Sequence, residues 1–174
     1  GAQRSRAVDV LDAVFKGIED RPRGVHVAQV DVNFGQIKLH GLIGRVELLC
    51  DYVARAQRDG RPLREDPVIR ARIAQLLTET EVARVLGFSF VAKSMKGGAA
   101  PTVEASEYKL YATQLSQRVA NASLDIGGPA AQLRVGEADA PMNGRADTSY
   151  RCTVVETIGG GASEIQKNII ARRK

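Results

Sequence analysis

The sequence has little of what several classes of protein require. With two cysteines in 174 residues, it is not a small scaffold held together by disulfide bonds. No apolar run approaches the roughly 18–20 residues that a membrane-spanning helix needs, and there is no collagen repeat. A hydrophobic content of 44% with 26% charged residues is ordinary for a globular domain and excludes extensive disorder. One globular domain, alone or as part of a longer protein, is therefore expected.

The few cysteines and histidines also argue against a metal site. Cys50 and Cys152 are far apart and form neither a CxxC pair nor a Cys/His ligand spacing. His26 and His40 lack a partner at metal-ligand spacing. We therefore predict no metal ion and two buried free thiols, as in a protein of the reducing cytoplasm. A disulfide is possible only if folding brings the two cysteines together.

The charge balance is basic but mixed. The formal net charge is +5 and the isoelectric point is about 9.5. Arginines are frequent between residues 55 and 72, but acidic residues alternate with them, and aromatic residues make up only 5% of the chain. A surface that follows a nucleic-acid backbone would contain fewer acids and would carry aromatic side chains for stacking. We predict a solvated helical face and no nucleic-acid partner.

Apolar residues recur at intervals of three and four along most of the chain, which predicts amphipathic helices. Asp66, Thr102 and Ser163 are the predicted N-caps, and Pro67 suits the first position of a helix. A polar stretch with glycine and proline predicts a mobile loop from about 135 to 148. The four predicted helices cover about residues 30–58, 66–96, 102–126 and 163–173.

Long helices separated by short breaks predict an all-α fold, an antiparallel four-helix up-down bundle over residues 25–174. A short extra N-terminal segment, residues 1–24, precedes the bundle and has a helical pattern over residues 7–23. The β-branched stretch 25–32 allows a short extended piece. No run of alternating residues predicts a sheet of any size.

The segment 157–167 carries the most chemical information. Gly159, Gly160 and Gly161 run directly into the N-terminus of the last predicted helix. Backbone N–H groups without side-chain cover, at the positive end of a helix dipole, suit an anion such as a phosphate. A flexible hinge or a helix cap explains the same residues equally well. Neither a Walker loop nor a dinucleotide-binding pattern is present.

Residues 158–172, with the letters IGGGASEIQKNIIAR, resemble the C-terminal signature of the acyl-CoA dehydrogenases. The stretches 58–74, 104–110 and 124–131 resemble three further parts of the same bundle in actinobacterial members. These parts are the linker with the second helix, the start of the third helix, and a Gly-Gly turn. All occur in the family's order, so the chain is similar to the family's C-terminal helical-bundle domain over about residues 28–172.

The resemblance implies part of a flavoenzyme that removes two hydrogens from the α and β carbons of an acyl-CoA. In that family a carboxylate takes the α proton while FAD takes the β hydride. The bundles pack into homo- or hetero-oligomers, in which glycine-rich turns of one subunit contact the FAD of its neighbour. The positions that match the family's FAD contacts are Gly127, Gly128, Gly159, Gly160, Gly161, Ala162 and Glu164.

The catalytic base is where the sequence departs from the family's pattern. The signature position that carries the catalytic glutamate in many members is Gly160, which has no side chain to accept a proton. Other members take the base from an earlier helix, near residues 32–35 here, where no glutamate occurs. Glu47 and Asp51 are better explained as solvated helix charges. The chain is thus similar to the non-catalytic subunit of heteromeric members; the alternative is a stand-alone helical assembly module that binds no flavin.

Overall fold

The computed structural model describes residues 34–96 and 101–173. The predicted N-terminal segment 1–24 and the extended piece at 25–32 lie outside these residues. The described chain forms five α-helices: α2 (Phe34–Arg55), α3 (Pro67–Met95), α4 (Thr102–Gly127), α5 (Arg145–Glu156) and α6 (Ser163–Arg173). Two-residue strands β1 (Gln57–Arg58) and β2 (Arg61–Pro62) and the 3-10 turns η1 (Leu63–Glu65), η2 (Pro129–Gln132) and η3 (Pro141–Gly144) connect them.

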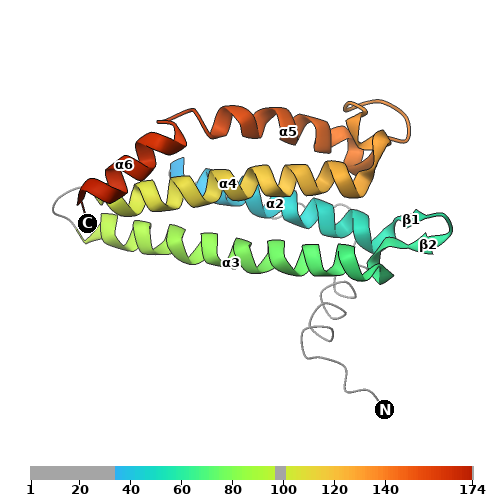
Figure 1. Cartoon of the computed structure of the whole chain (residues 1–174), viewed down its shortest axis with the longest axis horizontal. Coiled ribbons are helices and arrows are strands. Elements are labelled where there is room, and N and C mark those ends of the chain that lie inside the picture. The colour runs from blue at the N-terminus through green and yellow to red at the C-terminus, as the bar shows by residue number, and fades with distance from the viewer. Residues whose placement is uncertain (1–33, 97–100, 174) are drawn as a thin grey trace, which may run out of the picture.

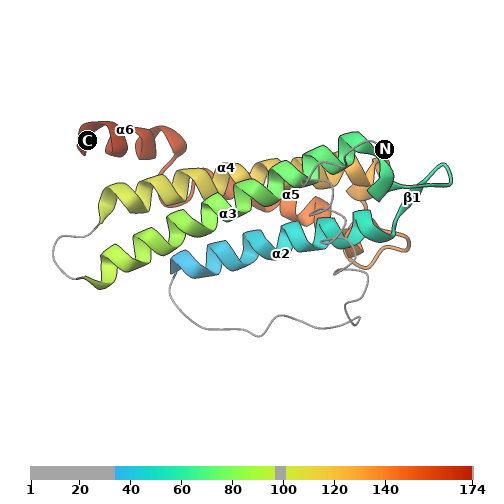
Figure 2. The same ribbon diagram turned by 90° about the horizontal axis from the view of Figure 1, so that it is seen from below.

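The helices form a bundle in which α4 lies at the centre and contacts every other described helix. Successive long helices run in opposite directions, and α5 and α6 follow one another along α4 in the fourth position of the bundle (Figures 1 and 2). The predicted all-α, up-down bundle is confirmed. Its fourth element is two helices joined by a turn, where one helix was predicted.

The core follows the predicted apolar stripes. Tyr108 of α4 is buried against α3, where a Cβ on Gly87 would lie 3.2 Å from its ring, and burial raises the pKa of the phenol to about 12. Each fully buried Leu, Ile or Val side chain contributes about 1.5–3 kcal/mol. The largest buried aliphatic side chains are Leu42, Leu49, Val53, Ile73, Leu115 and Val119.

The helix ends agree with the sequence in part. The Asp66 carboxylate accepts hydrogen bonds from the N–H groups of Val68 at 2.8 Å and Ile69 at 3.2 Å, which confirms it as the N-cap of α3. The cap prediction for Thr102 is wrong, because Pro101 occupies the cap position and Thr102 is the first residue of α4. The first predicted helix is three residues too long, since the chain leaves α2 at Arg55 for a tight hairpin.

The predicted loop 135–148 is wrong at its C-terminal end, because α5 begins at Arg145. The pattern of α5 is reversed: the small or polar residues Ala146 and Thr153 face the core, while Val154 and Val155 are exposed. A search for an apolar stripe over a polar face therefore misses this helix. The connection between α4 and α5 is made by η2 and η3.

The two thiols differ in exposure, so the prediction of two buried cysteines is correct for Cys50 and wrong for Cys152. Cys50 of α2 is buried and Cys152 of α5 is exposed, and both are free. Burial, with the nearby Asp51 and Glu47 carboxylates, raises the pKa of the Cys50 thiol to about 12. Within the described residues, no helix has the length and apolar character needed to cross a membrane.

Candidate functional site

The predicted site residues fall into two places in the bundle. The first glycine turn, Gly127 and Gly128, ends α4 and leads into η2. The second glycine turn, residues 159–162, joins α5 to α6, and Glu164 follows it in the first turn of α6. The structure thus separates the seven residues into two groups, each at a helix boundary.

The first glycine turn is closely packed on one side. A Cβ on Gly127 would lie 2.7 Å from the Cβ of Ala131 and 3.2 Å from the Cε of Met142, so only glycine fits. Gly128 has a φ of 69° and nothing within 4 Å of where its Cβ would be. Its N–H donates to the Leu124 carbonyl at 2.9 Å, and its carbonyl accepts from the Ala131 N–H at 2.9 Å. Gly128 therefore offers an open surface and no spare donor.

Two arginine side chains contact the C-terminal end of α4 at this turn. The Arg58 guanidinium, from the hairpin, donates to the Ile126 carbonyl at 2.6 Å. Arg72 of α3 forms an ion pair with Asp125 at 2.9 Å. The C-terminus of a helix is the negative end of its dipole, so these cations offset a local negative potential.

The second glycine turn has its carbonyl groups fastened to the bundle. The Gln166 side chain is buried, and its Nε2 donates to the carbonyls of Gly160 at 3.0 Å and Gly161 at 3.3 Å. The Lys109 Nζ, from α4, also donates to the Gly161 carbonyl. Gly160 and Gly161 have φ values of 72° and 99°, a region that favours glycine. Three hydrogen bonds thus hold two successive peptide groups.

The N–H groups of this turn are available. In the described part of the chain, those of Gly160, Gly161 and Ala162 donate to no protein acceptor, and they precede the positive end of the α6 dipole. No atom lies within 4 Å of where a Cβ on Gly160 would be, so a ligand can approach the backbone. The donors and the nearby Lys109 ammonium suit an anionic group.

A bidentate ion pair ties the start of the turn to α2. Arg45 donates to the two carboxylate oxygens of Glu156, the last residue of α5, at 2.6 and 3.2 Å. Both side chains are about one quarter exposed, at 23% and 28%. The carboxylate nearest the turn on its N-terminal side is therefore held in an ion pair with α2.

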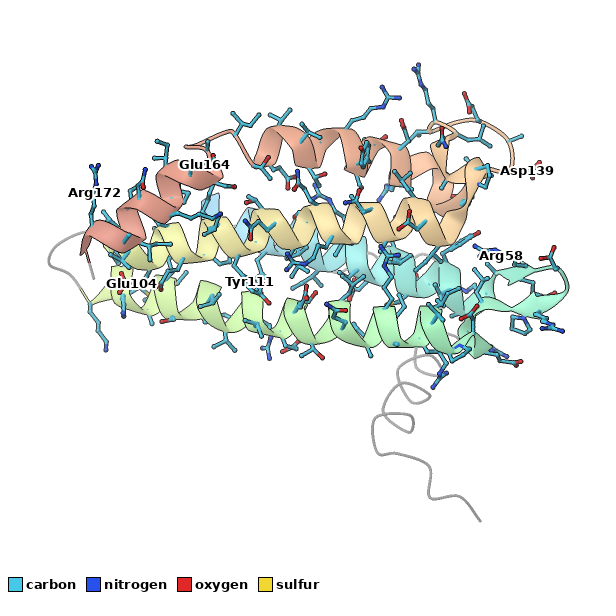
Figure 3. All side chains as sticks on the ribbon, in the orientation of Figure 1. Arg58, Glu104, Tyr111, Asp139, Glu164 and Arg172 are labelled. Atoms are coloured by element: carbon cyan, nitrogen blue, oxygen red, sulfur yellow. The ribbon has the colours of Figure 1, made fainter. Side chains whose placement is uncertain are left out.

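The two turns lie apart in the structure. Lys109 contacts Gly161, and 18 residues of α4 separate Lys109 from Gly127, which is about 27 Å along the helix. Figure 3 places Arg58 and Glu164, one beside each turn, in opposite halves of the bundle. The two groups of predicted residues therefore cannot act as one compact site within a single chain.

Residues 157–162 contain no carboxylate, and Gly160 stands where the resemblance to the family leads us to expect the catalytic glutamate. Of the earlier candidate stretch 32–35, residues 32 and 33 lie outside the described residues, and the Phe34 side chain is not described. Glu47 and Asp51 are half-buried on α2 beside Cys50. Among the described residues, no group of three or more His, Cys, Asp or Glu side chains could hold a metal ion.

Four contact residues were not singled out by sequence reasoning: Lys109, Gln166, Arg45 and Arg58. Lys109, Gln166 and Arg58 lie inside stretches that resemble the family, which is the only signal that could have marked them. Arg45 and Arg58 bond partners more than 60 positions away in the chain, and the spacing of apolar residues does not predict such contacts.

Residues 23–174 match the family model described as the C-terminal domain of acyl-CoA dehydrogenases. The fold, the glycine turn before the last helix and this match agree on the class of protein: a helical-bundle domain of the acyl-CoA dehydrogenase type. The chain belongs to the acyl-CoA dehydrogenase family and carries its C-terminal domain.

Two curated relatives are similar in sequence. Acyl-CoA dehydrogenase FadE26 of Mycobacterium tuberculosis is 28% identical over 115 residues, which cover 64% of this chain and 28% of the relative. Acryloyl-CoA reductase (NADH) of Anaerotignum propionicum is 31% identical over 169 residues, which cover 97% of this chain and 40% of the relative. The chain therefore spans less than half the length of the relatives that it matches.

Solved structures share the fold. The ChsE4-ChsE5 complex from Mycobacterium tuberculosis aligns with a TM-score of 0.68 at 23% identity, covering 76% of this chain and 34% of that one. A steroid acyl-CoA dehydrogenase, Tcur3481-Tcur3483, aligns with a TM-score of 0.60 at 25% identity, covering 76% and 36%. Both alignments cover about a third of the solved chain, as expected for one domain of a larger enzyme.

Proposed function

We propose that this chain is the C-terminal domain of an FAD-dependent acyl-CoA dehydrogenase subunit. In this proposal the domain contributes to flavin binding and to subunit assembly, and it supplies no catalytic base. The observation that carries the proposal is the second glycine turn, which presents backbone donors at the start of α6 and has Gly160 where the glutamate is expected. FAD, when bound, accepts the hydride removed from the acyl-CoA substrate.

The second turn supports contact with a charged part of the cofactor. The N–H groups of residues 160–162, the positive end of α6 and the Lys109 ammonium together favour an anion. Gly159 lies at the α5 side of the second turn, where an added Cβ would be 3.3 Å from the Val155 carbonyl oxygen. Glu164 is exposed in the first turn of α6, where it can accept a hydrogen bond from a ribose or amide group.

The first turn supports a different kind of contact. Gly128 has no spare N–H and lies at the negative end of α4, which disfavours a phosphate. Its open surface instead suits a flat, neutral group, such as the adenine part of FAD, with Arg58 beside it. Because the turns are about 27 Å apart along α4, we propose that they contribute to two different flavin sites of an oligomer.

Exposed apolar side chains support assembly with another subunit. Tyr150, Val154 and Val155 are exposed on α5, and Ile158 is exposed between α5 and the second turn. An apolar stripe that a monomer leaves exposed is typical of an interaction surface. The similarity to the ChsE4-ChsE5 complex supports a heteromeric acyl-CoA dehydrogenase as the assembly.

The same apolar stripe favours the alternative function, a helical assembly module that binds no flavin. Both functions require the outer side of α5, so the oligomeric state does not separate them. Flavin content does, because only the first function retains the cofactor when the assembly is complete.

The test uses the full natural protein that carries this chain, purified alone and after co-expression with other acyl-CoA dehydrogenase subunits of its organism. We expect bound flavin, seen as absorbance at about 450 nm, and oxidation of an acyl-CoA only when another subunit supplies the base. Turnover by the protein alone would contradict the absence of a base. Absence of flavin from every combination would favour the assembly module.

A further inference from the structure

We infer that Lys109 and Gln166 are positioning residues that set the direction of the peptide groups in the second glycine turn. This inference rests on the proposed function. Gln166 bonds the carbonyls of Gly160 and Gly161, and Lys109 bonds the carbonyl of Gly161 from a different helix. The two side chains draw the turn's acceptors toward the bundle and leave its donors facing outward.

The direction of a glycine peptide group needs such support. Gly160 and Gly161 have positive φ values and no side chains, so their backbone has many accessible conformations. Rotation of either peptide group would exchange an outward N–H for an outward carbonyl. An anion would then meet an acceptor instead of a donor, and the turn would repel the ligand that it is proposed to bind.

The contacts are built into the fold. The Gln166 side chain is only 6% exposed, and a Cβ on Gly161 would lie 2.7 Å from its Nε2, so the amide fills the space that this glycine leaves. The Gln166 backbone N–H also donates to the Ala162 carbonyl at 3.1 Å. The backbone N–H of Gln166 thus bonds the residue that precedes α6, and its side chain holds the turn.

Lys109 contributes a second effect that Gln166 does not. It comes from α4, so it fixes the turn relative to the centre of the bundle. Its ammonium also places a positive charge beside the start of α6, adding to the dipole. We therefore expect loss of Lys109 to weaken the binding of an anion by orientation and by charge, and loss of the Gln166 donor by orientation alone.

Two variants test the inference in the full natural protein with its partner subunits. Gln166→Met keeps the length of the side chain and removes its donor without adding a charge; Lys109→Met keeps the length and removes the ammonium. Arg118→Met is the matched control, since Arg118 is a cation of α4 whose partner is Glu79 of α3. Lys109→Arg restores a donor and a charge.

The first readout is the dissociation constant for FAD, titrated alone into the flavin-free protein. We expect it to rise about tenfold or more in Gln166→Met and Lys109→Met, and less than about twofold in Arg118→Met. Lys109→Arg should recover most of the affinity. Raising the salt concentration should narrow the difference between Lys109→Met and the unchanged protein, because part of that difference is electrostatic.

The second readout is amide hydrogen exchange without FAD. We expect faster exchange at the hydrogen-bonded amides that border the turn, those of residues 159 and 166, in both variants, while the core of α4 keeps its protection. If the unchanged protein binds FAD and both variants bind it equally well, the positioning role is overturned while the proposed function stands. If the unchanged protein with its partners binds no FAD, the proposed function is overturned and the inference with it. Exchange that rises over the whole bundle would also overturn a positioning role.

Discussion

The two glycine turns look alike as letters and differ in their physics. Gly127 is glycine because Ala131 and Met142 leave no room for a Cβ, at the end of α4 where carbonyl groups accumulate. Gly160 has empty space around it and is favoured by its φ of 72°, before the end of α6 where N–H groups accumulate. The kind of group that a glycine pair at a helix boundary can bind therefore depends on two things. One is which end of the helix the pair occupies, and the other is which hydrogen bonds its peptide groups already make.

The largest effect is expected for Gly127→Ala, which tests the packing of the first turn. The added Cβ would be 2.7 Å from the Cβ of Ala131, a fixed backbone-linked atom that cannot rotate away. Overpacking of this kind lowers the free energy of unfolding by about 2 kcal/mol. Chemical denaturation of the full protein measures it.

The control for that variant is Gly41→Ala on α2, where nothing lies within 4 Å of the new Cβ. Replacing an exposed glycine inside a helix with alanine stabilises a protein by about 0.5–1 kcal/mol. We therefore expect the free energy of unfolding to fall in Gly127→Ala and to rise in Gly41→Ala. A stability loss at Gly127 no larger than the change at Gly41 would mean that the first turn is loosely packed.

A smaller loss is expected for Gly160→Ala in the second turn. The new Cβ meets no atom within 4 Å, so only the backbone conformation opposes it. Holding a non-glycine residue at positive φ costs about 1–2 kcal/mol. Thermal unfolding of Gly160→Ala and Gly127→Ala, measured side by side, compares the two losses of stability. A larger loss in Gly160→Ala would contradict the conclusion that the first turn is the more closely packed.

The sequence predicted the bundle because the apolar stripes of α2, α3 and α4 keep a regular spacing against the core. It missed α5 because the core contacts there are Ala146 and Thr153, which no hydrophobic pattern marks. It located both glycine turns, since a cluster of glycines is visible in any sequence. It could not show that Gly128 has no spare N–H, because that depends on the Leu124 carbonyl four residues earlier in a helix whose end was uncertain.

A third effect is expected for Glu156→Gln, which tests how firmly the second turn is held. Glu156 accepts two hydrogen bonds from Arg45 and is the last residue before the turn region. A bidentate pair that is partly shielded from water contributes about 1 kcal/mol. We expect a loss of that size at low salt and a smaller one at high salt, because ion screening weakens the pair already present.

A double-mutant cycle isolates this contact. Arg45→Met and Glu156→Gln are combined, and the coupling energy is the part of the stability change that is not additive. Coupling close to zero would mean that the ion pair does not fasten α5 to α2. The first turn has an ion pair of its own, between Arg72 and Asp125, but these side chains are more exposed, at 40% and 61%, so its dependence on salt should be weaker.

The smallest effect is expected for Arg58→Ala beside the first turn. Arg58 bonds the Ile126 carbonyl at 2.6 Å from a largely exposed hairpin, and such a hydrogen bond contributes about 0.5 kcal/mol. Arg61→Ala is the matched control, because Arg61 is the cross-strand neighbour of Arg58 and removes the same charge. A difference between the two variants in urea unfolding measures the carbonyl contact. Since its acceptor is neutral, the difference should persist at high salt, whereas the Arg45–Glu156 contribution should shrink; equal salt dependence would mean that both turns are held by charge alone.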